Sequence, residues 1–225
     1  MSLGLRIGKR ERCVSAATIK QYQGAAAAHA SDAMGRLFHG GSALRPMHKE
    51  GGMVGAALTV KTRPGDNLLV HKALGMLSPG DVLVVDAGGD TTNAIIGELM
   101  AGQAQQAGAA GVIIYGAIRD YGTINKGTFP IYAVGVTHRG PYKDGPGEIN
   151  FPIAIDGMVI NPGDLIVGDE DGVVAVPYDN VDEILKSILA TREKEGKKMA
   201  TIRAGEPMDR KWADDILRKL GCEGL

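Results

Sequence analysis

The chain has 225 residues, enough for one domain to bury a substantial core without disulfide or metal support. Its 25 lysine and arginine residues are balanced by 26 acidic residues, and aromatic residues make up 4%. This composition gives no electrostatic or stacking basis for nucleic acid as a partner, and no run approaches the roughly 18 apolar residues of a membrane span. Cys13 and Cys222 form no CxxC pair, so we expect reduced thiols in a cytoplasmic protein.

Apolar patterning and turn residues predict three elements in the first third of the chain. They are one or two alanine-rich helices from 18 to about 38 with Thr18 and Ser31 as N-caps, a strand at Met53–Thr62, and a short helix at Asn67–Met76.

The central stretch carries the clearest pattern. Asp81–Ala87 is a continuous apolar run, which predicts a strand covered on both faces. Thr91 or Thr92 would then cap a helix from about Asn93 to Ala107, with Ile95 and Ile96 on its apolar face. Val112–Ile118 is a second apolar run. Strand, helix and strand in this order predict a βαβ unit with parallel strands.

The second half reads as β-rich structure followed by a helix. Short strands are expected at Pro130–Val136, Pro152–Ile155, Met158–Ile160, Asp164–Val167 and Gly172–Val176. From Asp179 onward the apolar residues repeat at helical spacing. We therefore expect one α/β domain over residues 1–225, with a core at about 30–178 and a C-terminal helical extension at about 179–225.

Two segments should lie at the ligand-binding edge of the sheet. In parallel sheets ligands bind beyond the carboxyl ends of the strands, and Gly88-Gly89-Asp90 and Arg119-Asp120 each follow a predicted strand. One interpretation of Arg119-Asp120 is a salt-bridged strand end. The other is a site in which the carboxylate binds a hard cation and the guanidinium stabilises charge on an oxygen. Glu98, on the intervening helix, would add a third polar group near this edge.

These residues also carry a family resemblance. The run GDVLVVDAGGDTTNAIIGELMAGQAQQAGAAGVIIYGAIRD resembles the RraA-like superfamily, and most of all its metal-dependent aldolase branch. The resemblance extends over roughly residues 30–205 and includes PGDNLLVHKAL and PGDLIVGDEDGVVAVP. The enzymatic branch carries an aspartate, twenty intervening residues and then Arg-Asp. This chain keeps the spacing and Arg119-Asp120 but has Glu98 in place of the aspartate.

The resemblance implies a fold and a set of site residues. The fold would be RraA-like, a swivelling-domain-like layered α/β/α architecture. Asp120 would bind Mg²⁺ or Mn²⁺, and Arg119 would contact the substrate oxygen. Glu98 would be catalytic together with Arg119, and the backbone amides of Leu99 and Met100 would hold the pyruvyl group of the substrate.

Further residues are implied outside this central set. A glutamate from the C-terminal helix of a neighbouring subunit would reach the metal through water, with Glu195 as the best match and Glu193 as the second. This arrangement needs a homo-oligomer, a trimer or a hexamer. Arg139 is the candidate for binding a distal carboxylate, since an arginine fork fits that geometry.

The activity implied is metal-dependent cleavage of a 4-hydroxy-2-oxo acid, such as 4-hydroxy-4-methyl-2-oxoglutarate, to pyruvate and a second oxo acid. Decarboxylation of oxaloacetate would be a side activity. Two alternatives stay open: a non-catalytic regulator that binds a ribonuclease or helicase, and another metal-dependent lyase acting on a hydroxy or sugar acid. No glycine-rich methyl-donor motif is present, which argues against a methyltransferase.

Overall fold

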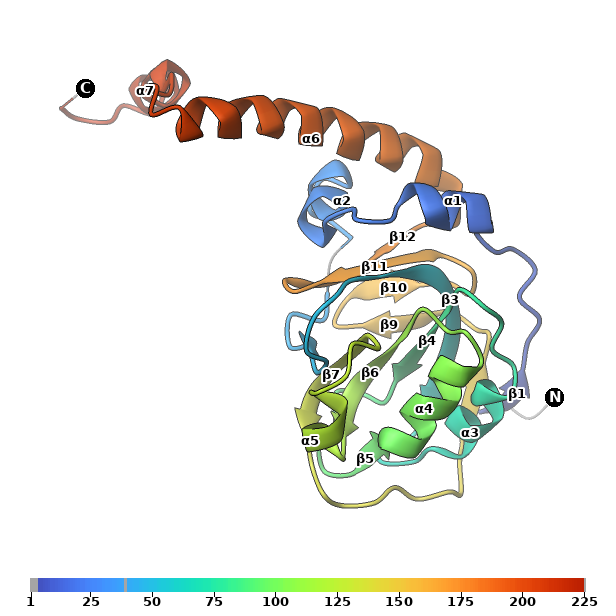
Figure 1. Cartoon of the computed structure of the whole chain (residues 1–225). Helices are drawn as coiled ribbons and strands as arrows, with labels where there is room; N and C mark the ends of the chain where they lie inside the picture. The colour runs from blue at the N-terminus through green and yellow to red at the C-terminus, as the bar shows by residue number, and fades with distance from the viewer. Residues whose placement is uncertain (1–3, 39, 225) are drawn as a thin grey trace. The chain divides into compact units, whose positions relative to one another are not determined.

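A mixed sheet built around the predicted βαβ unit organises the chain (Figure 1). The computed structural model describes residues 4–38 and 40–224. Strands β4 (Asp81–Asp86) and β6 (Gly111–Ile118) pair in parallel, with Val82 opposite Gly111. The helix α4 (Glu98–Gln106) lies between them in the chain. The predicted parallel βαβ unit is confirmed.

The sheet has ten strands in the order β1-β8-β3-β4-β6-β7-β2, with β5 pairing with β6, and β11 pairing with both β3 and β12. Strands β9 (Ile153–Ile155) and β10 (Met158–Ile160) form a separate antiparallel pair. The other strands are β1 (Leu5–Ile7), β2 (Arg45–Pro46), β3 (Met53–Thr62), β5 (Ala94–Ile96), β7 (Ile131–Val136), β8 (Gly147–Ile149), β11 (Leu165–Asp169) and β12 (Gly172–Val176).

The helices lie before, within and after this sheet in the chain. They are α1 (Ala16–Gln21), α2 (Ala27–Ala33), α3 (Leu68–Leu74), α4, α5 (Tyr121–Ile124), the 3₁₀ turn Tyr178–Asn180, α6 (Val181–Arg203) and α7 (Lys211–Lys219). Among the described residues, no helix has the length and apolar character needed to cross a membrane.

Strand β4 shows why the central strands carry continuous apolar runs. Leu83 and Val85 pack in one core cluster with α3 and α4, while Val82 and Val84 pack in another with the β9–β10 hairpin. Each fully buried side chain of this size contributes about 1.5–3 kcal/mol through burial of apolar surface. Figure 1 shows α3 and α4 together on one side of the sheet. The predicted layered α/β fold is confirmed, with the hairpin as part of the layer on the opposite face.

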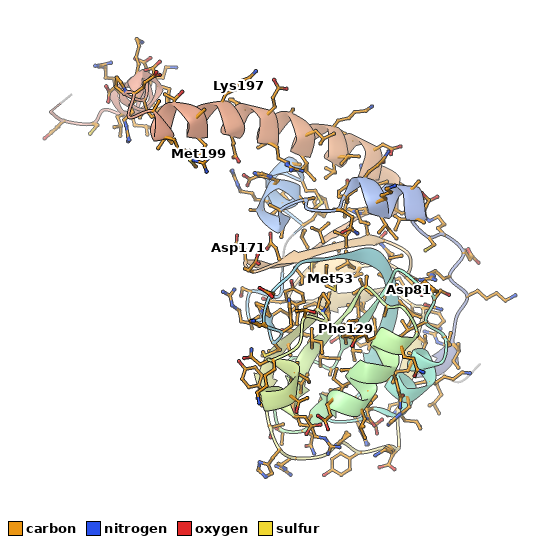
Figure 2. The ribbon with its side chains drawn as sticks, in the orientation of Figure 1. Met53, Asp81, Phe129, Asp171, Lys197 and Met199 are labelled. Carbon is orange, nitrogen blue, oxygen red and sulfur yellow. The ribbon has the colours of Figure 1, made fainter. Side chains whose placement is uncertain are left out.

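A third core cluster joins the N-terminal helices to β11, β12 and the first turns of α6. Tyr22 is fully buried there, and its hydroxyl donates to the backbone oxygen of Val181 at 2.6 Å. Burial raises the pKa of Tyr22 to about 12. Met53, labelled in Figure 2, is the first residue of β3. It is 1% exposed and belongs to the same core cluster as Val82 and Val84.

The chain divides into two compact units, Met1–Ile188 and Leu189–Leu225. The first contains the sheet and all three core clusters. The second contains the rest of α6 and α7. Cys13 and Cys222 are both free and exposed.

The predicted N-caps were wrong. Two N-terminal helices are present, but α1 is capped by Ser15, whose Oγ accepts the backbone N–H of Thr18 at 3.0 Å. Ser31 lies inside α2, which has no side-chain cap. Ser15 accepts this bond because it precedes the first helical residue, whereas Thr18 is already within the helix.

The helix predicted from about Asn93 begins later in the structure. Ala94–Ile96 forms the strand β5, which pairs in parallel with the end of β6, with Ala94 opposite Ala117. Helix α4 begins at Glu98 after Gly97 as its N-cap. Buried Ile95 and Ile96 are compatible with a strand as well as with a helical stripe. The end of β6 extends beyond its pairing with β4, and the segment pairs there as a strand.

Candidate active site

A cavity of about 300 Å³ opens at the carboxyl ends of β5 and β6. The residues that matter most for its chemistry are Asn67, Leu99, Met100, Arg119, Asp120 and Lys143. They come from the starts of α3 and α4, the end of β6 and the loop before β8. The cavity therefore lies at the edge of the sheet predicted from the parallel strand order.

Strand β6 delivers Arg119 and Asp120 to this edge. The backbone N–H of Arg119 still follows the strand ladder, donating to the Ile96 oxygen at 2.9 Å. Asp120 then adopts φ 58°, a left-handed conformation that aspartate tolerates better than most residues, and this turn ends the strand. The Asp120 backbone oxygen accepts from Thr123 and Ile124, which starts α5.

The two side chains do not form a strong ion pair. Arg119 Nε lies 3.7 Å from Asp120 Oδ2, and the side chains are 46% and 39% exposed. An ion pair this long and this exposed is worth at most about 1 kcal/mol. A structural salt bridge at the strand end is therefore a weak explanation for the Arg119-Asp120 pair. Both side chains are accessible to a ligand in the cavity.

The start of α4 supplies backbone donors beside them. The Glu98 N–H donates to Asp120 Oδ2 at 3.1 Å, and the Ala101 N–H donates to the Gly97 oxygen at 3.0 Å. Between them, the N–H groups of Leu99 and Met100 have no acceptor within the described part of the chain. Free N–H groups at a helix N-terminus suit a carboxylate or an enolate oxygen.

Gly97 is required by the closeness of α4 to Asp120. A Cβ at this position would overlap Asp120 Oδ2 and come 2.9 Å from Arg119 Cγ. We expect Gly97→Ala to displace both side chains and to lower kcat/KM by about 10²-fold, comparable with losing one transition-state contact. Gly102→Ala is the matched control, because a Cβ there meets nothing within 4 Å and alanine favours a helix by about 1 kcal/mol. Equal activity of the two variants would contradict this role.

Lys143 and His71 also line the cavity and contribute to its electrostatic character. Burial and the charge of Lys143 together lower the pKa of His71 below its ordinary value, which favours the neutral imidazole. Lys143 and Arg119 are then the cations of the lining, and Asp120 is its anion. This balance favours an anionic ligand.

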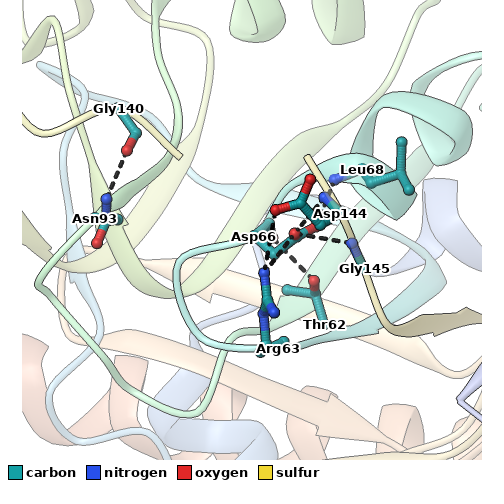
Figure 3. Close-up of polar contacts among 8 residues, drawn as sticks. All are labelled: Thr62, Arg63, Asp66, Leu68, Asn93, Gly140, Asp144 and Gly145. Atoms are coloured by element: carbon teal, nitrogen blue, oxygen red, sulfur yellow. Dashed lines mark hydrogen bonds and ion pairs between the residues drawn. The ribbon is translucent and has the colours of Figure 1, made fainter. Parts of the chain in front are cut away.

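Asp66 fixes the loop that carries Lys143 (Figure 3). Its fully buried carboxylate accepts the N–H groups of Leu68, Asp144 and Gly145 at 2.9, 2.7 and 2.9 Å. Burial alone would raise the pKa of Asp66, but these three donors and the Arg63 guanidinium outweigh it, and the pKa lies below its ordinary value.

This carboxylate makes stability dependent on pH. Because the pKa of Asp66 is lower in the folded state, its contribution is present above the unfolded pKa of about 3.9 and is lost as the pH falls further. We expect the urea midpoint of the wild type to fall more steeply between about pH 5 and 3 than that of Asp66→Asn. Parallel pH profiles for the two proteins would show that Asp66 is not part of this linkage.

The structure brings together some of the predicted site residues and not others. Arg119, Asp120, Leu99 and Met100 line the cavity. Glu98 does not: it is the first residue of α4, its side chain is exposed, and its backbone N–H makes the contact with Asp120.

Arg139 and the turn Gly88-Gly89-Asp90 are also outside the lining. Arg139 is exposed, and its backbone oxygen accepts from the Ala94 N–H at 2.8 Å. The glycine turn packs against Tyr115, because β5 and Gly97 occupy the place beside Arg119 that the sequence interpretation gave to it.

Lys143 was missed by the sequence interpretation. It belongs to a Pro- and Gly-rich loop, PYKDGPG, with no strand or helix pattern that would locate it. The residue that fixes this loop, Asp66, lies in the Pro64-Gly65-Asp66 turn far earlier in the chain. Sequence alone does not show that the two segments are in contact.

The glutamates predicted from the C-terminal helix lie in the second unit. Glu193 accepts from Lys197, labelled in Figure 2, at 2.7 Å in an exposed i,i+4 ion pair. Glu195 is exposed on the same helix. Their proposed role needs a neighbouring subunit, so it stays a prediction.

The residues at Asp120 fit a mostly hydrated cation. Within residues 4–38 and 40–224, no group of three or more histidine, cysteine, aspartate or glutamate residues could hold a metal ion. Asp120 Oδ2 accepts from Glu98, but no described residue donates to Oδ1, and this oxygen is available as a ligand. Mg²⁺ often binds through one or two protein carboxylates and keeps several waters.

The fold and cavity define an α/β protein with an accessible cavity at the carboxyl edge of its sheet. The family model described as Aldolase/RraA matches residues 27–175, and the chain belongs to this RraA-like family. The predicted resemblance is confirmed.

Three similar proteins bear on function. A protein of Halalkalibacterium halodurans, provisionally named a 4-hydroxy-4-methyl-2-oxoglutarate aldolase, is 44% identical over 69% of this chain and 74% of that protein. A Thermus thermophilus protein named 4-hydroxy-4-methyl-2-oxoglutarate aldolase is 36% identical over 50% of this chain and 68% of that protein. The structure of Streptomyces coelicolor RraAS2, described as an unusual member of the RNase ES inhibitor RraA family, is 25% identical with a TM-score of 0.75, covering 84% of this chain and 98% of that one.

Proposed function

We propose that this chain is a lyase that cleaves a 4-hydroxy-2-oxo acid, of the 4-hydroxy-4-methyl-2-oxoglutarate kind, to pyruvate and a second oxo acid. The observation that carries the proposal is the convergence of Arg119, Asp120 and the free N–H groups of Leu99 and Met100 on one cavity. The names of the two similar aldolases support it.

The chain's own groups match the demands of the reaction. The free N–H groups of α4 bind the carboxylate of the 2-oxo acid. Breaking the C3–C4 bond leaves its electron pair on C3, and negative charge develops on the ketone oxygen as the enolate forms. The Arg119 guanidinium donates to that oxygen and cannot itself lose a proton. The C4 hydroxyl proton leaves as the bond breaks, and water then protonates C3 of the enolate to give pyruvate. Glu98 lies outside the cavity lining, and we propose it as the candidate that accepts the hydroxyl proton through water.

We propose Asp120 as the protein ligand of a divalent cation, Mg²⁺ or Mn²⁺. When bound, such a cation supplies a Lewis acid that polarises the ketone of the substrate. Loss of carbon dioxide from oxaloacetate also forms the enolate of pyruvate, so we propose that decarboxylation accompanies the aldolase activity. We further propose a homotrimer or homohexamer in which Glu195, or else Glu193, of a neighbouring subunit approaches the site.

Lys143 is the candidate for the distal carboxylate of the substrate. We expect Lys143→Met to raise KM for a dicarboxylic substrate by about tenfold, equivalent to about 1.4 kcal/mol, with a smaller change in kcat. Arg139→Met is the matched control and should change KM by less than about twofold, since Arg139 is outside the cavity lining. Steady-state kinetics on both variants checks this. A larger rise in KM for Arg139→Met than for Lys143→Met would indicate that Arg139 binds the distal carboxylate.

Pyruvate release tests the proposed activity. Lactate dehydrogenase and NADH report pyruvate formed from a panel of 4-hydroxy-2-oxo acids and oxaloacetate in the presence of Mg²⁺. We expect the highest kcat/KM for a substrate with a second carboxylate. No release from any member of the panel would rule out the aldolase proposal.

A second candidate function is regulation of a ribonuclease by binding. It is favoured by the similarity to Streptomyces coelicolor RraAS2 across almost the whole of that chain. A pure interaction protein has no need for an accessible carboxylate beside free helix N–H groups. Absence of pyruvate release together with ribonuclease binding that persists in Asp120→Asn would favour this alternative.

A further inference from the structure

The loop 139–145 is fixed to the rest of the unit at three places. Near its start, the Ala94 N–H donates to the Arg139 oxygen, and Asn93 Nδ2 donates to the Gly140 oxygen at 2.6 Å. In its middle, Tyr142 exchanges backbone hydrogen bonds with Gly65 and Asn67 at 2.8 and 3.0 Å. The third place is its end, where Asp66 binds it.

Lys143 stands between the second and third of these places. The residue before it, Tyr142, is fixed by backbone bonds, and the two residues after it donate to Asp66 Oδ2. Figure 3 shows the carboxylate of Asp66 between Arg63, Leu68 and the Asp144-Gly145 backbone. The backbone of an exposed lysine is therefore held by a carboxylate that is fully buried.

Asp66 also fixes the start of a second segment that lines the cavity. Its Oδ1 accepts the Leu68 N–H at the first residue of α3, the helix on which the cavity residue His71 lies. Asn67, next in the chain, is 2% exposed and donates through Nδ2 to the Ile95 oxygen at 2.9 Å. One carboxylate thus joins the start of α3 to the loop that carries Lys143, using one oxygen for each.

We propose that Asp66 is a positioning residue that determines specificity by holding the Lys143 backbone at the cavity, so that this cation meets the second carboxylate of a dicarboxylic 2-oxo acid. Lysine has a flexible stem of four methylenes, and ordering it costs conformational entropy when a ligand binds. A fixed backbone removes the further cost of ordering the loop, so only the side chain remains to be ordered when the ligand binds. The choice of ligand in this inference rests on the proposed function. The hydrogen bonds by which Asp66 fixes the loop do not depend on it.

Asp66→Asn removes one of the two acceptor oxygens of the carboxylate, one of which binds the start of α3 and the other the loop. Asparagine has a single acceptor oxygen, so it cannot serve both the Leu68 N–H and the loop donors. Asp164→Asn is the matched control: Asp164 is 2% exposed and accepts the backbone N–H groups of Asn161 and Tyr178 at 2.8 and 2.9 Å, but it does not line the cavity. Both variants lose a buried carboxylate that binds backbone amides.

Two measurements on the full chain with Mg²⁺ test the proposal. Hydrogen exchange followed by mass spectrometry reports protection of the peptide 140–147. Calorimetric titration compares 2-oxoglutarate, which has a second carboxylate, with pyruvate, which lacks it. We expect Asp66→Asn to lose protection in this peptide and to bind 2-oxoglutarate about tenfold more weakly, with pyruvate affinity changed by less than about twofold. Asp164→Asn should leave peptide protection and both affinities at wild-type values.

A double variant distinguishes positioning from general destabilisation. If Asp66 acts through Lys143, adding Asp66→Asn to Lys143→Met should not weaken 2-oxoglutarate binding further. Unchanged protection in Asp66→Asn, equal losses for both ligands, additive effects in the double variant, or a wild type that binds neither ligand would each overturn the proposal. Absence of pyruvate release would overturn the proposed activity alone, because neither measurement depends on turnover.

Discussion

Asp120→Asn is expected to lower kcat/KM for pyruvate release by at least about 10³-fold, or about 4 kcal/mol of transition-state stabilisation. Asparagine keeps an oxygen that can accept the Glu98 N–H, so the start of α4 stays in place. It loses the negative charge that a hard cation requires from its ligand. The loss should therefore appear in activity and in Mn²⁺ affinity, with the unfolding midpoint close to that of the wild type.

The matched control is Asp90→Asn. Asp90 also follows a parallel strand at this edge and accepts the Thr92 N–H at 2.8 Å, but it is outside the cavity lining. We expect its activity and Mn²⁺ affinity to equal those of the wild type. Mn²⁺ binding followed by paramagnetic resonance gives the affinities directly, and tight binding by Asp120→Asn would remove this residue from the metal site.

Arg119→Lys is expected to lower kcat by about 10²- to 10³-fold, although the charge is conserved. Lysine replaces the planar guanidinium with a compact ammonium group, which does not reproduce the fixed donor geometry with which arginine can contact the substrate oxygen and Asp120 together. The present 3.7 Å separation of Arg119 Nε from Asp120 Oδ2 leaves the guanidinium free to make both contacts. KM should change less than kcat, because the contact strengthens as charge develops on the ketone oxygen.

The control for Arg119→Lys is Arg45→Lys, a surface substitution of the same kind on β2, where the guanidinium donates to the backbone oxygen of Asp171 at 3.2 Å. It should leave kcat unchanged. Steady-state kinetics of pyruvate release gives kcat and KM for both variants. An Arg119→Lys enzyme with wild-type kcat would mean that the guanidinium has no role in the chemical step.

The elements that place the Arg119-Asp120 pair could be predicted because their apolar runs have few interpretations. Asp81–Ala87 and Val112–Ile118 are too continuous for half-exposed strands, and the structure buries both strands between two layers. Parallel pairing then forces Arg119 and Asp120 to the edge where the cavity lies.

The start of α4 could not be predicted, because local pattern and tertiary pairing disagreed. Ile95 and Ile96 fit an apolar helical stripe, but the segment Ala94–Ile96 pairs with the end of β6 as a strand. This moves Glu98 to the first residue of the helix and brings its N–H, and not its carboxylate, to Asp120.

Lys143 and Arg139 show a second limit. Both belong to the same polar loop, and sequence favours Arg139 because a guanidinium binds a carboxylate well. The choice between them depends on hydrogen bonds from distant residues, Asp66 to one end of the loop and Asn93 to the other. Such long-range contacts leave no periodic signal in the chain.

The most direct test of the central claim is metal dependence of pyruvate release by the wild-type chain. Protein treated with a chelator and then dialysed is assayed with its best 4-hydroxy-2-oxo acid before and after addition of Mg²⁺ or Mn²⁺. We predict turnover at the uncatalysed rate without metal and full recovery on adding either ion. Turnover that persists in the metal-free protein would contradict the proposed role of Asp120 as a metal ligand and the metal dependence of the reaction.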